Sequence, residues 1–103
     1  MSFDGNENHD ISLEIASQWT ANYRNQNPNS TIAHYFGRKA IEEILAQDGA
    51  VGIRIYYAID ENNQKQLIIT GVTSDENDLY EGKLAEKSTL CPPHCGKNNP
   101  LNS

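Results

Sequence analysis

The residues best suited to chemistry lie in one short segment near the C-terminus, CPPHCG at residues 91–96. Cys91, His94 and Cys95 bring two thiols and an imidazole within five residues, a set that could bind zinc, form a disulfide or take part in thiol exchange. They supply three ligands where a structural zinc site uses four. The two prolines between the cysteines favour an extended backbone, which separates the thiols. We therefore expect reduced, metal-free cysteines packed as small apolar residues, with a local disulfide and a zinc site as the alternatives.

A second candidate site combines Arg54 and Tyr56 with the acidic loop at residues 75–81. This loop fails the calcium-binding pattern, because Leu79 and Tyr80 stand where a ligand and a glycine are needed. The sequence also lacks the nucleophile, zinc-protease, P-loop and dinucleotide-binding motifs. We expect no catalytic residue and no cofactor, and a ligand-binding or enzymatic role for Arg54, Tyr56 and this loop remains the weaker alternative.

The first element that must position these residues is a helix beginning near Asp10 or Ser12. Apolar residues recur there every four positions, which places them on one helical stripe: Ile11, Ile15, Trp19 and Tyr23. Pro28 ends the segment, because a residue before proline is disfavoured in helices. We predict that Trp19 is buried between this helix and a sheet.

A second helix is predicted over residues 30–48, again from an apolar stripe. Its members are Ala33, Phe36, Gly37, Ala40, Ile41, Ile44 and Leu45. Gly37 would lie in mid-helix at a close packing contact, with His34 at the boundary of the stripe. Gly49 would follow in the left-handed conformation that often ends a helix.

Beyond Gly49 the apolar period changes to two, which predicts a β-hairpin with strands at 51–60 and 66–73. A turn centred on residues 62 and 63 would pair Asp60 with Lys65, Tyr57 with Ile68, Ile53 with Val72 and Arg54 with Gly71. One sheet face would then carry Ile53, Ile55, Ile68 and Val72. The other would carry Arg54, Tyr56, Ala58, Leu67 and Ile69.

These elements predict an α+β fold with two helices packed on one face of a small antiparallel sheet. Residues 79–90 fit either a third strand or a short helix broken near Gly82. We expect one domain over residues 10–96, between mobile polar tails at 1–9 and 97–103.

Charge and hydropathy exclude several classes of partner. The net charge is -6, which does not suit nucleic acid or an anionic membrane surface. No apolar run approaches the ~20 residues of a membrane span, and residues 1–10 lack the features of a signal peptide. We expect a cytoplasmic protein that binds neither nucleic acid nor membrane.

Four motifs occur together: WTANYR at 19–24, GIRIYY at 52–57, TGVT at 70–73 followed by Asn77-Asp78, and CPPHCG at 91–96. In these motifs the chain resembles a family of short uncharacterised proteins from Bacteroidetes-type bacteria. The resemblance covers about residues 12–96 and implies no activity, cofactor or site residue.

The sheet face that the helices leave uncovered is the expected interaction surface, with Arg54, Tyr56, Leu67 and Ile69 as its candidate residues. We expect a homodimer formed through this face, with the C-terminal segment at residues 79–95 folded over the face as the alternative. An unknown protein partner is also expected. The sequence thus favours a non-enzymatic interaction module, with a thiol or zinc protein using Cys91, His94 and Cys95 as the alternative.

Overall fold

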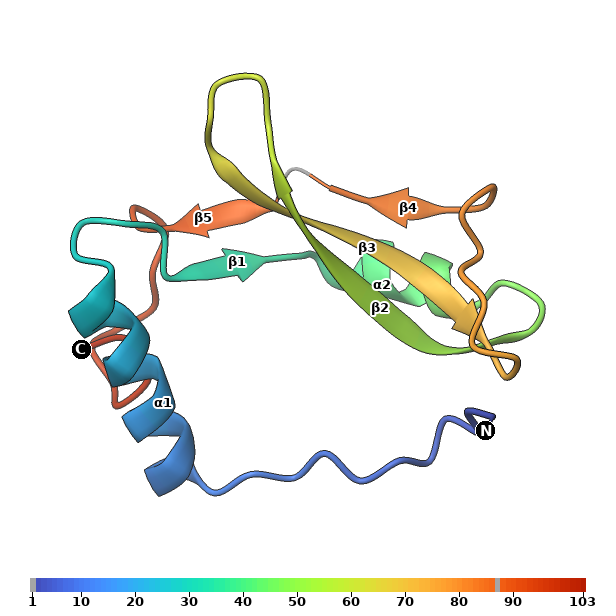
Figure 1. Ribbon diagram of the computed structural model, residues 1–103, viewed down its shortest axis with the longest axis horizontal. Helices are drawn as coiled ribbons and strands as arrows, with labels where there is room; N and C mark the ends of the chain where they lie inside the picture. Colours follow the sequence, from blue (N-terminus) through green and yellow to red (C-terminus); the bar gives the residue numbers. More distant parts are fainter. Residues whose placement is uncertain (1, 87) are drawn as a thin grey trace. The chain divides into compact units, whose positions relative to one another are not determined.

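A computed structural model describes residues 2–86 and 88–103 and shows an α+β fold with two helices and antiparallel strands (Figure 1). The chain divides into two compact units. The first contains Met1–Glu7 and Phe36–Ser88, and the second contains Asn8–Tyr35 and Thr89–Ser103. The predicted fold class is confirmed.

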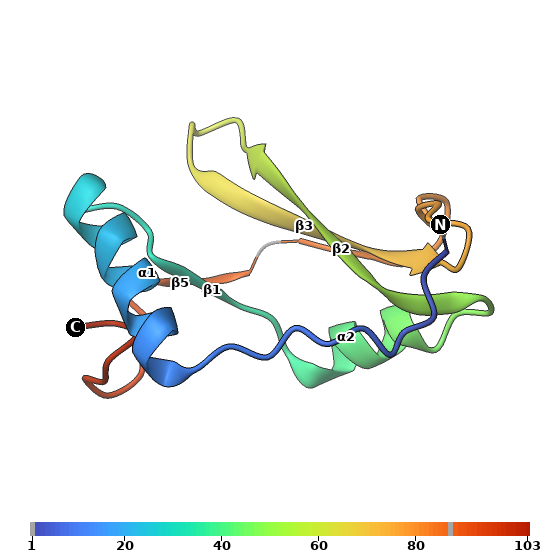
Figure 2. The same cartoon turned by 60° about the horizontal axis from the view of Figure 1, so that its bottom comes forward.

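The first unit is built on a three-stranded antiparallel sheet of β2 (Ala50–Ile59), β3 (Lys65–Thr73) and β4 (Leu84–Ala85), in the order β2-β3-β4. The predicted hairpin is therefore confirmed, and residues 79–90 contain a short third strand. The helix α2 (Arg38–Leu45) lies against one face of this sheet (Figure 2).

The hairpin turn is organised by Asp60, whose carboxylate oxygen Oδ1 accepts hydrogen bonds from the backbone N–H groups of Asn62 and Gln64, each at 2.9 Å. Asn63 N donates to Asp60 O at 3.0 Å, and Asn63 has a φ of 64°. A tight turn followed by one left-handed residue is typical of a three-residue hairpin loop. Asp60 consequently faces Gln64 across the hairpin, with Asp60 N donating to Gln64 O at 3.0 Å.

This turn makes the predicted strand register wrong by one residue. Tyr57 pairs with Leu67, Ile55 with Ile69 and Ile53 with Gly71. A slip of one residue exchanges the two faces of a strand. Leu67 and Ile69 therefore lie on the face of Ile55, and the predicted grouping of Leu67 and Ile69 with Arg54 and Tyr56 is wrong.

The core of the first unit lies between α2 and the sheet. Ile44 is completely buried and packs with Ile69 and Ala85. Partly buried apolar side chains complete the core, namely Phe36, Ala40 and Ile41. Three members of the predicted stripe, Ala40, Ile41 and Ile44, thus form the buried side of α2, whereas Phe36 packs from just before the helix and Leu45 is 44% exposed.

The predicted start of the second helix is wrong. Ala33 lies in a strand, β1 (Ala33–Tyr35), and Gly37 is the extended residue that precedes α2 rather than a mid-helix contact. The reason is the pairing of β1 with β5 (Thr89–Cys91), which opposes Ala33 to Cys91 and His34 to Leu90. A partner so distant in the chain leaves no local periodic signal.

The second unit contains β1, β5 and the helix α1 (Leu13–Gln26). Ser12 Oγ accepts a hydrogen bond from Ile15 N at 3.1 Å, which confirms Ser12 as the capping residue. No residue of α1 is buried, and Trp19 is 64% exposed, so the predicted burial of Trp19 is wrong. The helix belongs to a different unit from the sheet that was expected to cover it.

Across residues 2–86 and 88–103, no helix has the length and apolar character needed to cross a membrane.

Candidate functional site

The free side of β2 is the most distinctive surface of the first unit. The sheet order places β3 on one side of β2, and within the described chain no strand pairs with the other side. The N-terminal segment approaches this side near Val51, where a Cβ added to Gly5 would lie 2.8 Å from the Val51 carbonyl oxygen. From Ile53 to Ile59, no strand of the described residues pairs with this side of β2.

The hairpin turn shows which backbone groups point toward this free side. Asp60 and Gln64 form a hydrogen-bonded pair, and such pairs alternate with non-bonded pairs along an antiparallel ladder. Ala58, Tyr56 and Arg54 therefore direct their N–H and C=O groups toward β3. The residues between them direct theirs away from it.

Hydrogen bonds on the opposite side of β3 lead independently to the same assignment of inward and outward residues. Leu79 N donates to Gly71 O at 2.8 Å, and Ile69 pairs with Ala85 of β4. Gly71 and Ile69 thus bond away from β2, so their partners Ile53 and Ile55 bond away from β3. We call the outward-facing set Ile53, Ile55, Tyr57 and Ile59 the open edge of β2.

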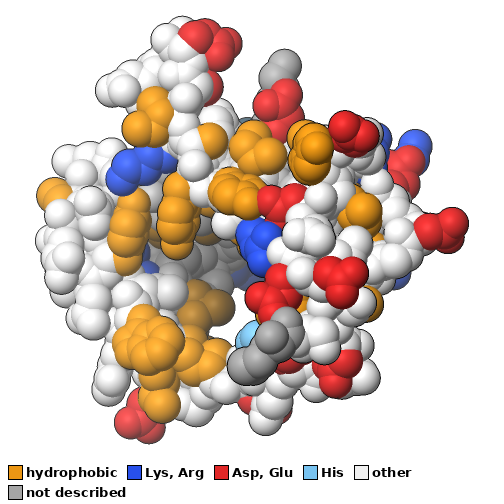
Figure 3. All heavy atoms as spheres, turned by 45° about the vertical axis from the view of Figure 1, so that its right-hand side comes forward, with side chains coloured by type: hydrophobic (Ala, Val, Ile, Leu, Met, Phe, Trp, Pro, Cys, Tyr) orange, Lys and Arg blue, Asp and Glu red, His pale blue; other side chains and the backbone are white. Residues whose placement is uncertain are grey.

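The side chains of the open edge are apolar and solvent-exposed. Their exposed fractions are 39% for Ile53, 48% for Ile55, 94% for Tyr57 and 66% for Ile59. Apolar side chains gather at the surface in Figure 3, with single charged groups among them. Arg54 is the one charged residue between Ala50 and Ile59. Folded proteins usually protect such an edge with charges, proline or a covering segment.

The structure brings Arg54 and Tyr56 together with the acidic loop, as one of the sequence-based alternatives supposed. Asp78 Oδ1 accepts a hydrogen bond from Arg54 Nη1 at 2.5 Å, and Asp78 Oδ2 accepts one from the Tyr56 hydroxyl. Arg54 Nη1 also donates to the Glu76 carbonyl oxygen at 3.3 Å. We call Arg54, Tyr56 and Asp78 the polar cluster.

The loop is held in place by its own backbone contacts. Asp78 bridges to Val72 of β3, and Thr73 N donates to Asn77 O at 2.9 Å. The hydrogen bonds to Asp78 raise the pKa of the Arg54 guanidinium and the pKa of the Tyr56 phenol. Both carboxylate oxygens of Asp78 are therefore used to fasten the loop to β2. In the sequence Asp78 was one of several carboxylates of the acidic loop, and nothing local marks its pairing across 24 residues.

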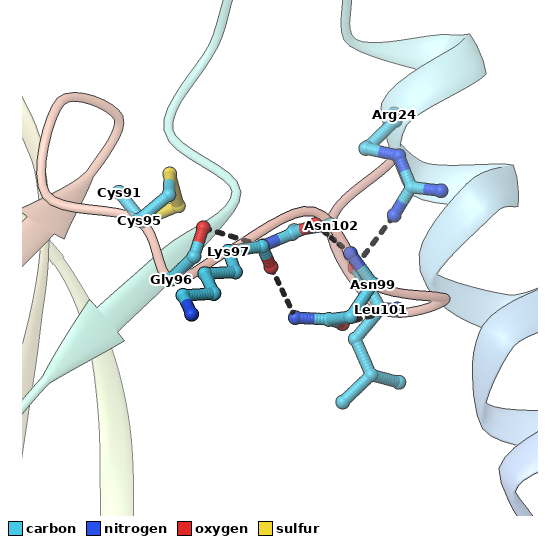
Figure 4. The surroundings of a disulfide bond; sticks show 8 residues. All are labelled: Arg24, Cys91, Cys95, Gly96, Lys97, Asn99, Leu101 and Asn102. Carbon is cyan, nitrogen blue, oxygen red and sulfur yellow. Dashed lines mark hydrogen bonds between the residues drawn. A yellow bond between two sulfur atoms is a disulfide. The ribbon is translucent and has the colours of Figure 1, made fainter.

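Cys91 and Cys95 form a disulfide, with their Cα atoms 4.8 Å apart (Figure 4). The expectation of two reduced cysteines on an extended segment is therefore wrong. The chain reverses within the segment, and His94 N donates to Leu90 O at 3.0 Å across the turn. The peptide bonds before Pro92 and Pro93 are cis.

The disulfide changes what this segment can do chemically. Zinc binds thiolates, and the sulfur atoms of a disulfide are not thiolates. Among the described residues, no group of three or more His, Cys, Asp or Glu side chains is arranged to hold a metal ion. Cys91 is buried in β5 at 7% exposure, whereas Cys95 is exposed. An external thiolate would therefore reach the sulfur of Cys95 first.

Residues 97–103, expected to be a mobile tail, make hydrogen bonds within the second unit. Arg24 of α1 donates to the carbonyl oxygens of Leu101, at 2.7 Å, and Ser103. Asn102 Nδ2 donates to the carbonyl oxygens of Gly96 at 3.3 Å and Lys97 at 3.1 Å (Figure 4). These contacts connect the segment after the disulfide to α1.

Comparison of the chain with protein-family models, curated proteins and solved structures finds no match in any of the three. A functional proposal therefore depends on the geometry of the chain itself.

Proposed function

We propose that this protein is a non-enzymatic protein-interaction module that binds an extended strand along the open edge of β2. The observation that supports this proposal is that four residues direct their backbone groups outward and also have exposed apolar side chains. They are Ile53, Ile55, Tyr57 and Ile59. An added strand would satisfy the backbone groups and cover part of the apolar surface. This is the recognition mode called β-strand addition.

The polar cluster supports this choice of surface. Arg54 and Tyr56 already bind Asp78 through the guanidinium Nη1 and the phenol hydroxyl, so both side chains are tied to the acidic loop. By fastening the acidic loop to β2, they keep the negative charges of that loop in a defined place beside the strand. We therefore assign the polar cluster a structural role and the open edge the binding role.

The net charge of -6 and the uncharged edge favour a protein partner over nucleic acid or an anionic membrane.

The test uses extended peptides selected from a display library for binding to the folded protein. We expect bound peptides to slow amide hydrogen exchange at Ile53, Ile55, Tyr57 and Ile59, as followed by NMR. The Ile55→Pro variant lacks one outward N–H and should lose this binding. Ile55→Ala keeps that N–H and should retain most of it.

The proposal fails if no selected peptide protects the open edge, or if Ile55→Pro binds peptides as well as the parent does. Circular dichroism shows that Ile55→Pro is folded before binding is compared. Proline is tolerated best at edge positions whose N–H faces outward, which makes residue 55 a suitable site.

The disulfide supports a second candidate function, thiol–disulfide exchange by Cys91 and Cys95. Disulfides in a reducing cytoplasm are usually transient and serve catalysis or redox sensing. A dithiol reductant would supply two electrons and two protons, giving two thiols on this chain and a disulfide on the reductant. Its test is the reaction with a small dithiol, in which Cys95 should be attacked first.

A further inference from the structure

We infer that the strand added to the open edge is β2 of a second copy, antiparallel to the first, with Tyr56 opposite the partner's Tyr56. This inference rests on the proposed function and names its partner. The two three-stranded sheets would then form one continuous sheet of six strands, with both α2 helices on the same face. Such a contact uses the same surface in both copies, as two-fold symmetry requires.

The register follows from the positions of the outward residues, which lie symmetrically at one and three residues on either side of Tyr56. With the two-fold axis at Tyr56, Ile55 faces the partner's Tyr57, and Ile53 faces the partner's Ile59. Every residue of the open edge then forms a hydrogen-bonded pair with another member of the same set.

Other registers leave outward groups without partners. A shift of one residue opposes outward residues to residues whose N–H and C=O groups already bond to β3. A shift of two residues opposes part of the open edge either to Val51, which the N-terminal segment approaches, or to Glu61 in the turn. The axis at Tyr56 avoids both.

Charge along the edge also fits a second copy. Two copies of net charge -6 repel each other, so they can associate only where like charges do not meet. In the proposed register, Arg54 faces the partner's Ala58 and Asp60 faces the partner's Gly52. Added side-chain atoms at Gly52 would meet nothing within 4 Å, so Asp60 of the other copy has room there.

The side chains across the interface are complementary in type. Ile55 and Tyr57 are directly opposed twice, once on each side of the axis, and aromatic–β-branched pairs are among the favourable cross-strand neighbours. The contact is one strand pair with four apolar side chains from each copy. Stable complexes bury about 800 Å² per partner, and a single strand pair is smaller, so we expect a dimer that dissociates on dilution.

Size exclusion with light scattering tests the association. At concentrations of tens of micromolar and above, we expect the mass to rise from 11.5 kDa toward twice that value. Ile55→Pro should remain at the monomer mass with an unchanged circular dichroism spectrum, whereas Ile55→Ala should still associate. A parent protein that stays monomeric up to millimolar concentration overturns the inference, as does an Ile55→Pro variant that dimerises like the parent.

Cysteine cross-linking tests the register. Tyr56 and the partner's Tyr56 would form a non-hydrogen-bonded pair with Cα atoms about 4.5 Å apart, close enough for a disulfide. Tyr56→Cys should therefore yield a covalent dimer under mild oxidation, and the matched variant Ala58→Cys should yield little. Mass spectrometry distinguishes this bond from Cys91–Cys95. Efficient cross-linking of Ala58→Cys instead of Tyr56→Cys overturns the register.

The two proposals fail in different ways. If the protein is monomeric but still binds library peptides along Ile53–Ile59, the inference that the partner is a second copy is wrong. The proposed function as an interaction module then still stands. A protein that neither dimerises nor binds peptides at the open edge overturns both.

Discussion

At the scale of single residues, Ile44 is the side chain on which the core of the first unit depends. It is completely buried and contacts both β3 and β4 through Ile69 and Ala85. We expect Ile44→Ala to lower the free energy of unfolding by about 2 to 5 kcal/mol, because it removes buried contacts and leaves a cavity. Urea unfolding followed by circular dichroism measures this change.

Trp19 provides the control for that measurement. Its side chain is larger than that of Ile44, but it is 64% exposed. We therefore expect Trp19→Ala to cost clearly less than Ile44→Ala, near the ~0.5 kcal/mol that is usual for surface substitutions. Equal losses in the two variants would contradict the burial described for α1 and α2.

Asp60 should make the hairpin sensitive to acid. Hydrogen bonds from Gln66 Nε2 at 3.0 Å, and from the backbone N–H groups of Gln64 and Asn62, lower the pKa of this carboxyl below its ordinary value of 3.8. A lowered pKa in the folded state stabilises the fold above the unfolded-state pKa, and this stabilisation is lost as the pH falls through the folded-state pKa.

We therefore expect the parent protein to unfold at a lower urea concentration below pH 3.8 than at pH 5. Asp60→Asn, which cannot ionise, should show a smaller fall over the same interval. An NMR titration measures the pKa of the Asp60 carboxyl directly. A pKa above 3.8 would contradict Asp60 as the cause of the acid sensitivity.

At the scale of elements, the strands of the hairpin could be predicted because their pattern is local. Alternating apolar residues mark β2 and β3, and the apolar face of α2 repeats with helical spacing. The register could not be predicted in the same way, since it depends on the geometry of the turn. Asp60 pairs with Gln64 and Asn63 is left-handed, which shortens the loop by one residue.

Elements and sites formed by distant segments were the ones missed. The pairing of β1 with β5 joins residues 33–35 to residues 89–91, and β4 contains two residues only. The Arg54–Asp78 ion pair and the local disulfide were open as alternatives in the sequence, but choosing them requires knowing where the chain turns. Arg54 and Tyr56 could be named as candidates, whereas the open edge of β2 became visible once the register was known.

The disulfide predicts a specific pattern of thiol reactivity in the segment after β5. Protein purified without reductant should show no free thiol in a colorimetric assay, and two thiols after reduction in denaturant. After mild reduction, an alkylating reagent should modify the exposed Cys95 faster than the buried Cys91. Two reactive thiols in the folded, air-exposed protein would contradict the disulfide.

At the scale of the whole molecule, the open edge and the disulfide lie in different units. The first unit carries the open edge of β2 and the polar cluster, and the second carries the disulfide. Reduction of Cys91–Cys95 therefore acts on a unit that does not contain the proposed interaction strand. The net charge of -6, by contrast, belongs to the whole chain and acts on any self-association.

This charge determines how dimerisation should respond to salt. Two copies of charge -6 repel each other, and the directly opposed residues of the proposed contact form no ion pair. Arg54 and the partner's Asp60 lie diagonally across it, but each is already hydrogen-bonded within its own copy, Arg54 to Asp78 and Asp60 to Gln66. The screening length falls from about 30 Å at 0.01 M salt to about 8 Å at 0.15 M. We therefore expect the dissociation constant measured by analytical ultracentrifugation to decrease over this range, while Ile55→Pro stays monomeric throughout. A dimer that weakens as salt is added would instead be held by ion pairs, which the edge-to-edge contact does not contain.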